Sequence, residues 1–324
     1  MTPPKPQRID PKKLPAKGRS GRPGGRPPGA PKVRKATARD WIAGARLRTI
    51  PLAIAPVALG TAAAYSIDEG WHWVRALLAL AVAVGLQIGV NYANDYSDGV
   101  RGTDSRRVGP ARLTGSGAAK PRTVLTVALV FFALAAVAGV VLVVLSQQWI
   151  LLAVGAACIV AAWFYTGGKR PYGYYGFGEL FVFVFFGLVA TVGTTFTQIG
   201  SVGIVSWVAG VAIGLLACAT LMINNIRDRE QDKLAGKRTL AVLIGDLPSR
   251  VVYAVLVALP FLILVFFTFL YDKAGFVFFA LLAAGPAILI GVTGKTASDR
   301  IIALQLTTLT AFLYGVGLAW AIAF

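Results

Sequence analysis

Long apolar runs, separated by short polar segments, dominate the chain from about residue 49 to its end. Each run has the length of a helix that crosses a bilayer, which is roughly 17–25 residues. Two glutamines at 147–148 divide the apolar stretch 123–166, which is too long for one span, so we expect a tight turn there. The pattern predicts an all-α integral membrane protein with nine transmembrane helices. The expected spans are about 49–66, 74–94, 123–145, 150–166, 179–198, 204–224, 250–270, 275–293 and 301–323.

The composition agrees with a membrane protein and excludes an ordinary soluble domain. Of the 324 residues, 56% are hydrophobic and 14% are charged, whereas a soluble domain carries about 25% charged residues. Two cysteines, Cys158 and Cys218, fall inside separate predicted spans, and His72 is the single histidine. These are too few ligands for a zinc site or a bis-histidine haem site.

The net charge of +18 raises the question of a nucleic-acid partner, but the distribution of basic residues points to membrane topology. With the N-terminus placed in the cytoplasm, 30 of the 32 Lys and Arg fall on the cytoplasmic side, and the other side holds Arg75 and Lys273. Loops rich in Lys and Arg are retained in the cytoplasm during insertion. We therefore expect no nucleic-acid partner, a cytoplasmic N-terminus and a C-terminus on the opposite side of the membrane.

Two parts of different composition make up the chain. Residues 1–35 are rich in Pro, Gly, Lys and Arg and hold almost no large apolar residue. Such a segment cannot bury enough apolar surface to fold alone. We predict a disordered basic cytoplasmic arm at 1–35, followed by one nine-helix membrane domain at 36–324 that is surrounded by membrane lipid.

Two polar clusters interrupt the apolar pattern, each at the cytoplasmic end of a predicted span. In each cluster an asparagine and two aspartates are spaced so that they lie on one face of a helix. The first cluster contains Asn91, Asp95 and Asp98, with Asn94 beside them, and the second contains Asn224, Asp228 and Asp232. The two helix ends can therefore present their carboxylates to a common site.

The chemistry of the two clusters suggests a metal-diphosphate site. Carboxylates at the mouth of a membrane span are costly and commonly mark a functional site. Four carboxylates that converge repel one another unless cations lie between them, and Mg²⁺ usually bridges one or two carboxylates to substrate phosphates. The alternative is that these residues are solvated helix ends, which is what we expect for Arg229 and Glu230 because they point away from the stripe.

Basic residues follow each cluster and are candidates for binding a diphosphate. Arg grips phosphate oxygens in a fork, and Lys supplies a point charge. For Arg101, Arg106 and Arg250, control of topology is the simpler interpretation. The diphosphate-binding candidates are Arg107, Arg112, Lys169, Arg170, Lys237 and, at the mouth of the first span, Arg48.

The segment 163–179 is dense in aromatic residues and glycines. Aromatic faces stabilise cations by about 0.5–2 kcal/mol each, so this segment is a candidate for sheltering the carbocation that forms when an allylic diphosphate leaves. Tyr165 lies nearest its span and is the strongest candidate. For Tyr172, Tyr174 and Tyr175, an aromatic belt at the lipid headgroups is an equally good interpretation.

These residues resemble the UbiA superfamily of intramembrane prenyltransferases, over about residues 40–324. The first motif of that family, N-D-x-x-D-x-x-x-D, is matched by residues 94–98, although Gly102 stands where the last aspartate is expected and Asp104 follows two residues later. The second motif, D-x-x-x-D, is matched by residues 228–232. The resemblance implies nine transmembrane helices around a central cavity, in a bacterial plasma membrane or an organelle of bacterial descent.

Within the superfamily, the two cluster-bearing loops are most similar to those of members that prenylate 1,4-dihydroxy-2-naphthoate. This implies transfer of a polyprenyl group from polyprenyl diphosphate to that acceptor, with loss of CO2, to give demethylmenaquinone. The implied cofactor is Mg²⁺. The implied metal ligands are Asp95, Asp98, Asp228 and Asp232, with Asn91, Asn94 and Asn224 completing the shell. The expected catalytic residues are Tyr165, Lys169 and Arg107, and Asn225 is expected to contact the diphosphate.

Three alternatives remain open from the sequence. One is a related prenyltransferase with another acceptor, such as 4-hydroxybenzoate, homogentisate or a haem. Another is a cation transporter with the acidic clusters as its ion path, although midspan polar residues are sparse and comprise Gln87, Thr195 and Thr220. A third, a CDP-alcohol phosphotransferase, requires a D-G-x-x-A-R signature that residues 98–102 do not supply.

Overall fold

The computed structural model describes residues 34–103 and 112–324, and these residues form helices and loops without a strand. The short helices outside the spans are α1 (Ala38–Ala45), η2 (Leu47–Thr49), η4 (Tyr172–Tyr175) and α9 (Leu240–Ile244). The other elements are α2 (Pro51–Asp68), α3 (Trp73–Arg101), α4 (Pro121–Ser146), α5 (Ile150–Phe164), α6 (Gly178–Val182), η5 (Phe183–Val189), α7 (Ala190–Ile199), α8 (Ile204–Leu234), α10 (Asp246–Thr268), η6 (Asp272–Ala280), α11 (Leu281–Thr293) and α12 (Ala297–Ala323).

Eight helical segments in the described part of the chain are long and apolar enough to cross a membrane. Two of them are composite, because α6, η5 and α7 run on as one span and η6 continues into α11. Helix α5 has 15 residues, which gives it a length of about 22 Å at 1.5 Å per residue, less than the roughly 30 Å of the hydrocarbon core. The predicted all-α membrane fold is confirmed. The predicted count of nine spans is not confirmed, because the 150–166 run forms this shorter helix.

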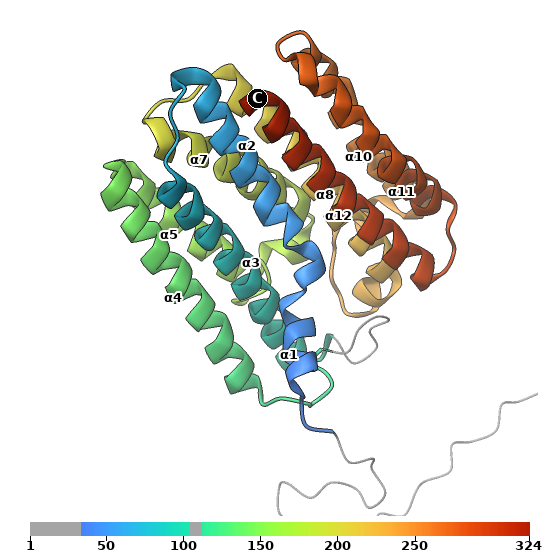
Figure 1. The fold of residues 1–324 in the computed structure, drawn as a ribbon. Helices are drawn as coiled ribbons and strands as arrows, with labels where there is room; N and C mark the ends of the chain where they lie inside the picture. Colours follow the sequence, from blue (N-terminus) through green and yellow to red (C-terminus); the bar gives the residue numbers. More distant parts are fainter. Residues whose placement is uncertain (1–33, 104–111) are drawn as a thin grey trace, which may run out of the picture. The chain divides into compact units, whose positions relative to one another are not determined.

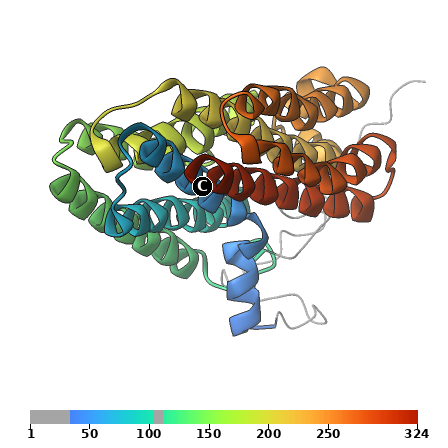
Figure 2. The same cartoon turned by 45° about the horizontal axis from the view of Figure 1, so that its top comes forward.

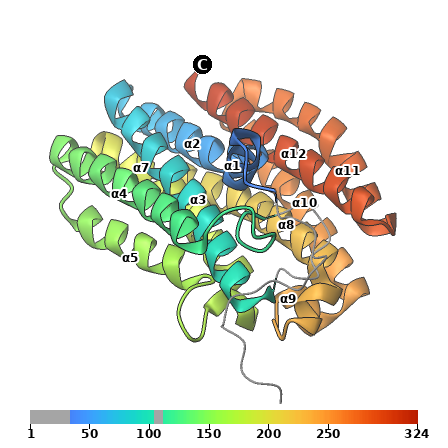
Figure 3. The same cartoon turned by 90° about the horizontal axis from the view of Figure 1, so that it is seen from below.

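The two helices that carry the polar clusters, α3 and α8, are linked by the helices between them. Helix α2 contacts both α3 and α8, and α7 also contacts both. Figure 1 shows α4 and α5 on the α3 side of the bundle and α10, α11 and α12 on the α8 side. Figure 2 shows α1 standing across the long axis of the bundle, and α1 contacts α3. Helices α2 and α7 therefore bridge α3 and α8. Figure 3 shows the bundle from the end at which α1 lies.

Local sequence explains where the cluster-bearing helices end and how closely α8 is packed. Helix α3 ends at Gly102, whose φ of 72° lies in the left-handed region that glycine tolerates. The π-helix η5 follows α6 directly, and such segments recur at functional sites. A Cβ on Gly187 of η5 would lie 2.6 Å from the Cα of Gly214, so these two glycines allow η5 and α8 to pack closely.

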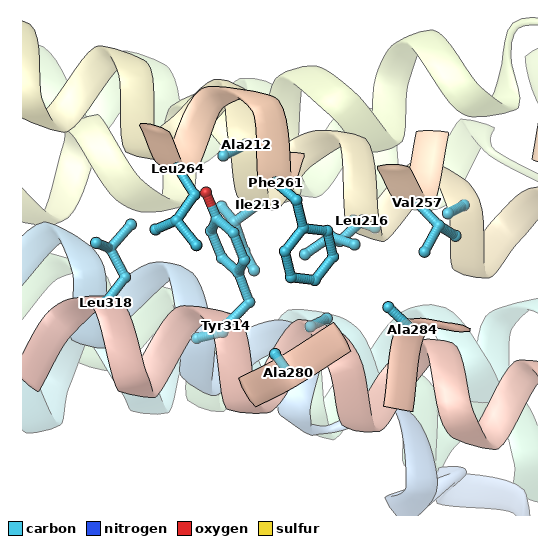
Figure 4. Packing of buried hydrophobic residues seen from close by; sticks show 14 of the residues in the cluster. Ala212, Ile213, Leu216, Val257, Phe261, Leu264, Ala280, Ala284, Tyr314 and Leu318 are labelled. Atoms are coloured by element: carbon cyan, nitrogen blue, oxygen red, sulfur yellow. The ribbon is translucent and has the colours of Figure 1, made fainter. Parts of the chain in front are cut away.

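The largest cluster of buried apolar side chains lies on the α8 side of the bundle. Ile213 and Leu216 of α8 lie opposite Phe261 of α10 and Tyr314 of α12 (Figure 4). The Tyr314 and Phe261 rings meet edge to face with centroids 5.7 Å apart. The Tyr314 hydroxyl donates to the carbonyl of Pro260 at 2.9 Å. In a membrane, van der Waals packing and hydrogen bonds of this kind hold helices together, and here they fix the position of α8.

Candidate active site

Two adjoining cavities lie beside the polar clusters. The larger has a volume of about 520 Å³ and is walled by α2, α3, α4, α5, α8 and the α6–η5–α7 span. The smaller has a volume of about 60 Å³ and is distinctly polar. Residues that line both are Arg46, Thr49, Asn91, Asn224 and Leu304. Further charged residues in the wall of the smaller cavity are Arg48, Asp95, Arg112 and Arg227. The cavities therefore meet between the two clusters.

Asp98, near the end of α3, binds three side chains from other segments. Its Oδ2 accepts a hydrogen bond from Arg112 Nη1 at 3.0 Å. Its Oδ1 accepts from Lys237 Nζ at 3.2 Å and from the hydroxyl of Tyr174. Burial, and after it the adjacent Asp98 carboxylate, raises the pKa of Tyr174 above its usual value. The phenol therefore stays protonated at neutral pH and donates to Asp98.

Asp95 and Asn91 of the first cluster hold neighbouring backbone segments. Asp95 accepts from the N–H of Leu113 at 2.9 Å with one oxygen and from the N–H of Thr114 at 2.8 Å with the other. Asn91 donates to the carbonyl of Ala45 at 3.0 Å. Asp95 thus fixes the loop that carries Arg112, and Asn91 fixes the end of α1.

Three hydrogen bonds dock the loop after α5 onto the end of α3. The Thr166 hydroxyl donates to Asn94 Oδ1 at 2.5 Å. Arg101 donates to the carbonyls of Thr166 and Gly168. Arg101, for which topology control was the simpler interpretation, therefore also positions this loop.

In the second cluster, Arg227 covers the polar face of α8. Its Nε and Nη2 donate to the two oxygens of Asp228, each at 2.7 Å, and Nη2 also donates to Asn224 Oδ1 at 2.8 Å. Asn225 points to another neighbour and donates to Glu179 Oε1 at 2.9 Å. The predicted contact of Asn225 with the diphosphate stays a prediction, since its amide is engaged with α6.

Lys237 joins the two clusters. Its Nζ lies 3.2 Å from an oxygen of Asp98 and 3.7 Å from an oxygen of Asp232. The same ammonium lies 4.7 Å from the centroid of the Tyr174 ring. The structure therefore brings the end of α3 and the end of α8 to one cationic group.

The predicted diphosphate-binding residues fall into three groups. The residues that the structure places at the clusters or in the wall of the smaller cavity are Arg48, Arg112 and Lys237. The residues that it places in an exposed part of the α5–η4 loop are Lys169 and Arg170. Arg107 lies outside the described part of the chain, as does Asp104, the possible substitute for the last aspartate of the first motif. The catalytic roles expected for Lys169 and Arg107 stay predictions.

Aromatic side chains form one wall of the larger cavity. Tyr165, Tyr172 and Phe181 all line it. The rings of Tyr165 and Tyr172 meet edge to face at 5.6 Å, and those of Tyr172 and Phe181 stack at 3.9 Å. Tyr174 is bonded to Asp98 instead, and Tyr175 is exposed.

Comparison with known proteins identifies the family. A model of the UbiA prenyltransferase family matches residues 53–300, which include both polar clusters. The chain belongs to the UbiA prenyltransferase family. This UbiA-family protein is 50% identical over 299 residues to the 1,4-dihydroxy-2-naphthoate octaprenyltransferase of Mycobacterium tuberculosis, with 88% of this chain and 97% of that one covered. It is 37% identical over 222 residues to the octaprenyltransferase of the same name from Escherichia coli, with 67% and 72% covered.

Solved structures show the same fold. A UbiA homologue from Archaeoglobus fulgidus, bound to GPP and Mg²⁺, matches this UbiA-family protein with a TM-score of 0.59 at 15% identity, covering 88% of this chain and 99% of that one. A homologue from Aeropyrum pernix, without ligand, matches with a TM-score of 0.62 at 17% identity, covering 84% and 96%. The UbiA-family protein is thus a multi-span membrane protein with the helical fold of this family.

The donor groups at the clusters fit a hard divalent cation. Within residues 34–103 and 112–324, no three His, Cys, Asp or Glu side chains form a group ready to hold a metal ion. Basic groups explain this, because Lys237 lies between Asp98 and Asp232 and Arg227 covers Asp228. An ammonium between two carboxylates takes the kind of position that Mg²⁺ takes between oxygen ligands. The carboxylate and amide oxygens of this UbiA-family protein therefore suit Mg²⁺.

Sequence reasoning did not single out Glu179 or assign a role to Arg227. Glu179 is 8% exposed, and its Oε2 has no hydrogen-bond partner among the described residues. The sequence does point to Glu179, because an acidic residue at the start of an apolar span is costly and commonly functional. The signal for Arg227 was its position between Asn224 and Asp228, where a long side chain reaches both.

Proposed function

We propose that this UbiA-family protein transfers a polyprenyl group from an allylic polyprenyl diphosphate to 1,4-dihydroxy-2-naphthoate, with loss of CO2, to give demethylmenaquinone in its reduced, hydroquinone form. The observation that carries the proposal is the small polar cavity that opens into a large apolar one. A polyprenyl diphosphate has the same two parts, a multiply charged head and an apolar tail. The 50% identity to the Mycobacterium tuberculosis octaprenyltransferase over 88% of the chain supports the choice of acceptor.

In this proposal the diphosphate occupies the smaller cavity. The guanidinium groups of Arg48, Arg112 and Arg227 reach its wall and bind phosphate oxygens in bidentate fashion. Asp98, Asp228 and Asp232 would hold Mg²⁺, which would supply the positive charge that neutralises the leaving diphosphate. A carboxylate oxygen has two lone pairs, so Asp95 remains a candidate ligand even though each of its oxygens accepts a backbone N–H.

The allylic carbon then lies where the two cavities meet, beside the aromatic wall. The faces of Tyr165, Tyr172 and Phe181 stabilise positive charge on that carbon by about 0.5–2 kcal/mol each. The C–O bond breaks with its electron pair moving to the diphosphate, and the electron-rich naphthoate ring forms the new C–C bond. The bond from the ring to its carboxylate then breaks, CO2 leaves, and the electron pair of that bond returns to the ring, which stays a hydroquinone. Because the apolar walls exclude water, the carbocation meets the acceptor rather than a hydroxide or water.

We further propose that the protein lies in a bacterial plasma membrane with its active site at the cytoplasmic face. The placement of 30 of the 32 basic residues supports a cytoplasmic N-terminus and a C-terminus on the far side. The bacterial origin of the relatives supports the plasma membrane. The basic arm at 1–35 and the membrane domain at 36–324 remain part of the same proposal.

The test is an assay of the purified full-length protein in lipid nanodiscs with radiolabelled octaprenyl diphosphate. Four acceptors are compared, namely 1,4-dihydroxy-2-naphthoate, 4-hydroxybenzoate, homogentisate and haem. We expect a Mg²⁺-dependent lipid-soluble product with the naphthoate, release of its carboxyl carbon as CO2, and loss of both signals with EDTA. The Asp228→Ala variant, checked for insertion and folding by thermal unfolding, serves as the inactive control. A product with a different acceptor, and none with the naphthoate, overturns the proposal.

A further inference from the structure

The larger cavity extends far beyond the space that the reacting groups need. Along α3 its lining runs from Ala79 to Asn94, which corresponds to about 22 Å at 1.5 Å per residue. It therefore crosses most of the roughly 30 Å hydrocarbon core. A tail that starts at the diphosphate site, beside Asn91 and Asn224, has to follow this cavity toward the opposite end of the bundle.

In the half of the larger cavity that is farther from the polar clusters, three wall positions are glycines and therefore carry no side chain. Gly139 of α4, Gly155 of α5 and Gly193 of α7 all line the cavity, and they come from three different helices. A Cβ on Gly155 or Gly193 would meet no atom within 4 Å, and a Cβ on Gly139 would make only an ordinary contact with Val82 at 3.7 Å. Close helix packing therefore does not explain these glycines, in contrast to the close approach at Gly187.

A short, mostly unburied helix forms the wall on the same side of the bundle. Helix α5 is too short to cross the hydrocarbon core, and among its fifteen residues only Ala161 is buried. The opposite side is tightly closed. A Cβ on Gly315 of α12 would lie 2.4 Å from the Cβ of Ala55 in α2, so no chain passes between these two helices.

We propose that the prenyl tail leaves the active site between α4, α5 and α7, and that the absence of side chains at Gly155 and Gly193 is what lets tails longer than the cavity pass. This rests on the proposed function only in taking a polyprenyl diphosphate as substrate. Short tails end before the glycines and lie wholly within the cavity. Long tails pass the glycines and continue into lipid beside α5.

The test compares Gly155→Leu and Gly193→Leu with the unchanged protein, using geranyl diphosphate as the short substrate and octaprenyl diphosphate as the long one. The new side chains enter open space, so we expect folding to be preserved. We expect kcat/KM for the short substrate to stay within about twofold and kcat/KM for the long substrate to fall about tenfold to a hundredfold, as overfilling a packed space does. The proposal is overturned if the ratio of kcat/KM for the long substrate to kcat/KM for the short one is unchanged, including the case in which both values fall equally.

The matched control is Gly275→Leu. Gly275 also has no atom within 4 Å of an added Cβ, but it lies exposed in η6 and does not line the larger cavity. In this variant we expect the ratio of kcat/KM for the long substrate to kcat/KM for the short one to be unchanged. A fall equal to that of the cavity variants would contradict the assignment, because the effect would then not depend on the cavity.

Photo-crosslinking tests the route without any acceptor. A long prenyl diphosphate with a benzophenone at its tail end is bound to the unchanged protein in nanodiscs and irradiated, and the labelled peptides are sequenced. We expect label on α5 and α7, and label on α12 or the facing side of α2 would overturn the route. Since no transfer is needed, this result stands apart from the acceptor assay, whose failure would overturn the proposed function alone.

Discussion

The first and second polar clusters carry the same types of residue, but the protein holds them in different ways. In the first cluster, Asp98 is bound by residues 14, 76 and 139 positions away along the chain. In the second, Asp228 is bound by the adjacent Arg227. Within the described part of the chain, the carboxylate of the first cluster therefore joins distant segments, whereas Asp228 of the second cluster shares its two strongest contacts with the adjacent residue.

Because of this difference, removing a carboxylate is expected to have different effects on stability in the two clusters. Removing a carboxylate that joins three segments disturbs the loops as well as the charge at the site. Removing one that pairs with its own helix disturbs mainly the charge. Substitutions in the two clusters are therefore expected to have similar effects on catalysis but different effects on stability.

The largest expected effect is that of Asp98→Ala. It removes the buried carboxylate shared by Arg112 and Lys237, and breaking a buried ion pair costs about 3–5 kcal/mol of unfolding free energy. It also removes a ligand and an electrostatic partner of the leaving group, so we expect turnover to fall by about a thousandfold or more. Thermal unfolding and turnover in nanodiscs measure the two effects.

The control for this prediction is Asp232→Ala in the second cluster. The Asp232 side chain is 14% exposed and lies 3.7 Å from Lys237, so we expect a stability cost of at most about 1 kcal/mol together with a comparable loss of turnover. If both variants lose the same stability, the contrast between the clusters is wrong.

A smaller effect is expected for Asp95→Asn, because the shape is kept and one of two backbone acceptors is lost. The N–H groups of Leu113 and Thr114 then compete for a single oxygen, at a cost of about 1–3 kcal/mol. Amide hydrogen exchange at these two positions should accelerate, while exchange in the middle of α8 should stay the same. Unchanged protection at Leu113 and Thr114 would show that Asp95 does not hold this loop.

The sequence predicts features that depend on residues close together in the chain, but not contacts between residues that are far apart in it. The apolar runs predict the helices, and the i, i+4 spacing predicts which residues share a face, because both depend on local geometry. The partners of Asp98 could not be predicted, since Arg112, Tyr174 and Lys237 approach it only after three separate loops have folded. The short α5 shows a second limit: an apolar run of spanning length does not reveal where a helix begins and ends.

An effect confined to substrate binding is expected for Arg227→Lys. Lysine keeps the charge in the smaller cavity, but it cannot form the two-point contact that the guanidinium makes with Asp228. We expect KM for the prenyl diphosphate to rise about tenfold with little change in kcat, the pattern of a lost binding contact. Steady-state kinetics with varied diphosphate tests this, and the reverse pattern, a lower kcat at unchanged KM, would assign Arg227 to the chemical step instead.

The smallest effect is expected for Glu230→Gln. Glu230 lies within the motif of the second cluster, so this variant tests whether a carboxylate matters because of its position in the motif or because of the contacts that it makes. Glu230 lies midway between Asp228 and Asp232 in the sequence. Its side chain is nevertheless 65% exposed and pairs with Arg229 rather than with Lys237 or Arg227. Exposed pairs of this kind contribute about 0–1 kcal/mol. We expect turnover within about twofold and stability within about 0.5 kcal/mol of the unchanged protein. A loss as large as that of Asp232→Ala would mean that net negative charge at the end of α8, and not the arrangement around Lys237, is what the site requires.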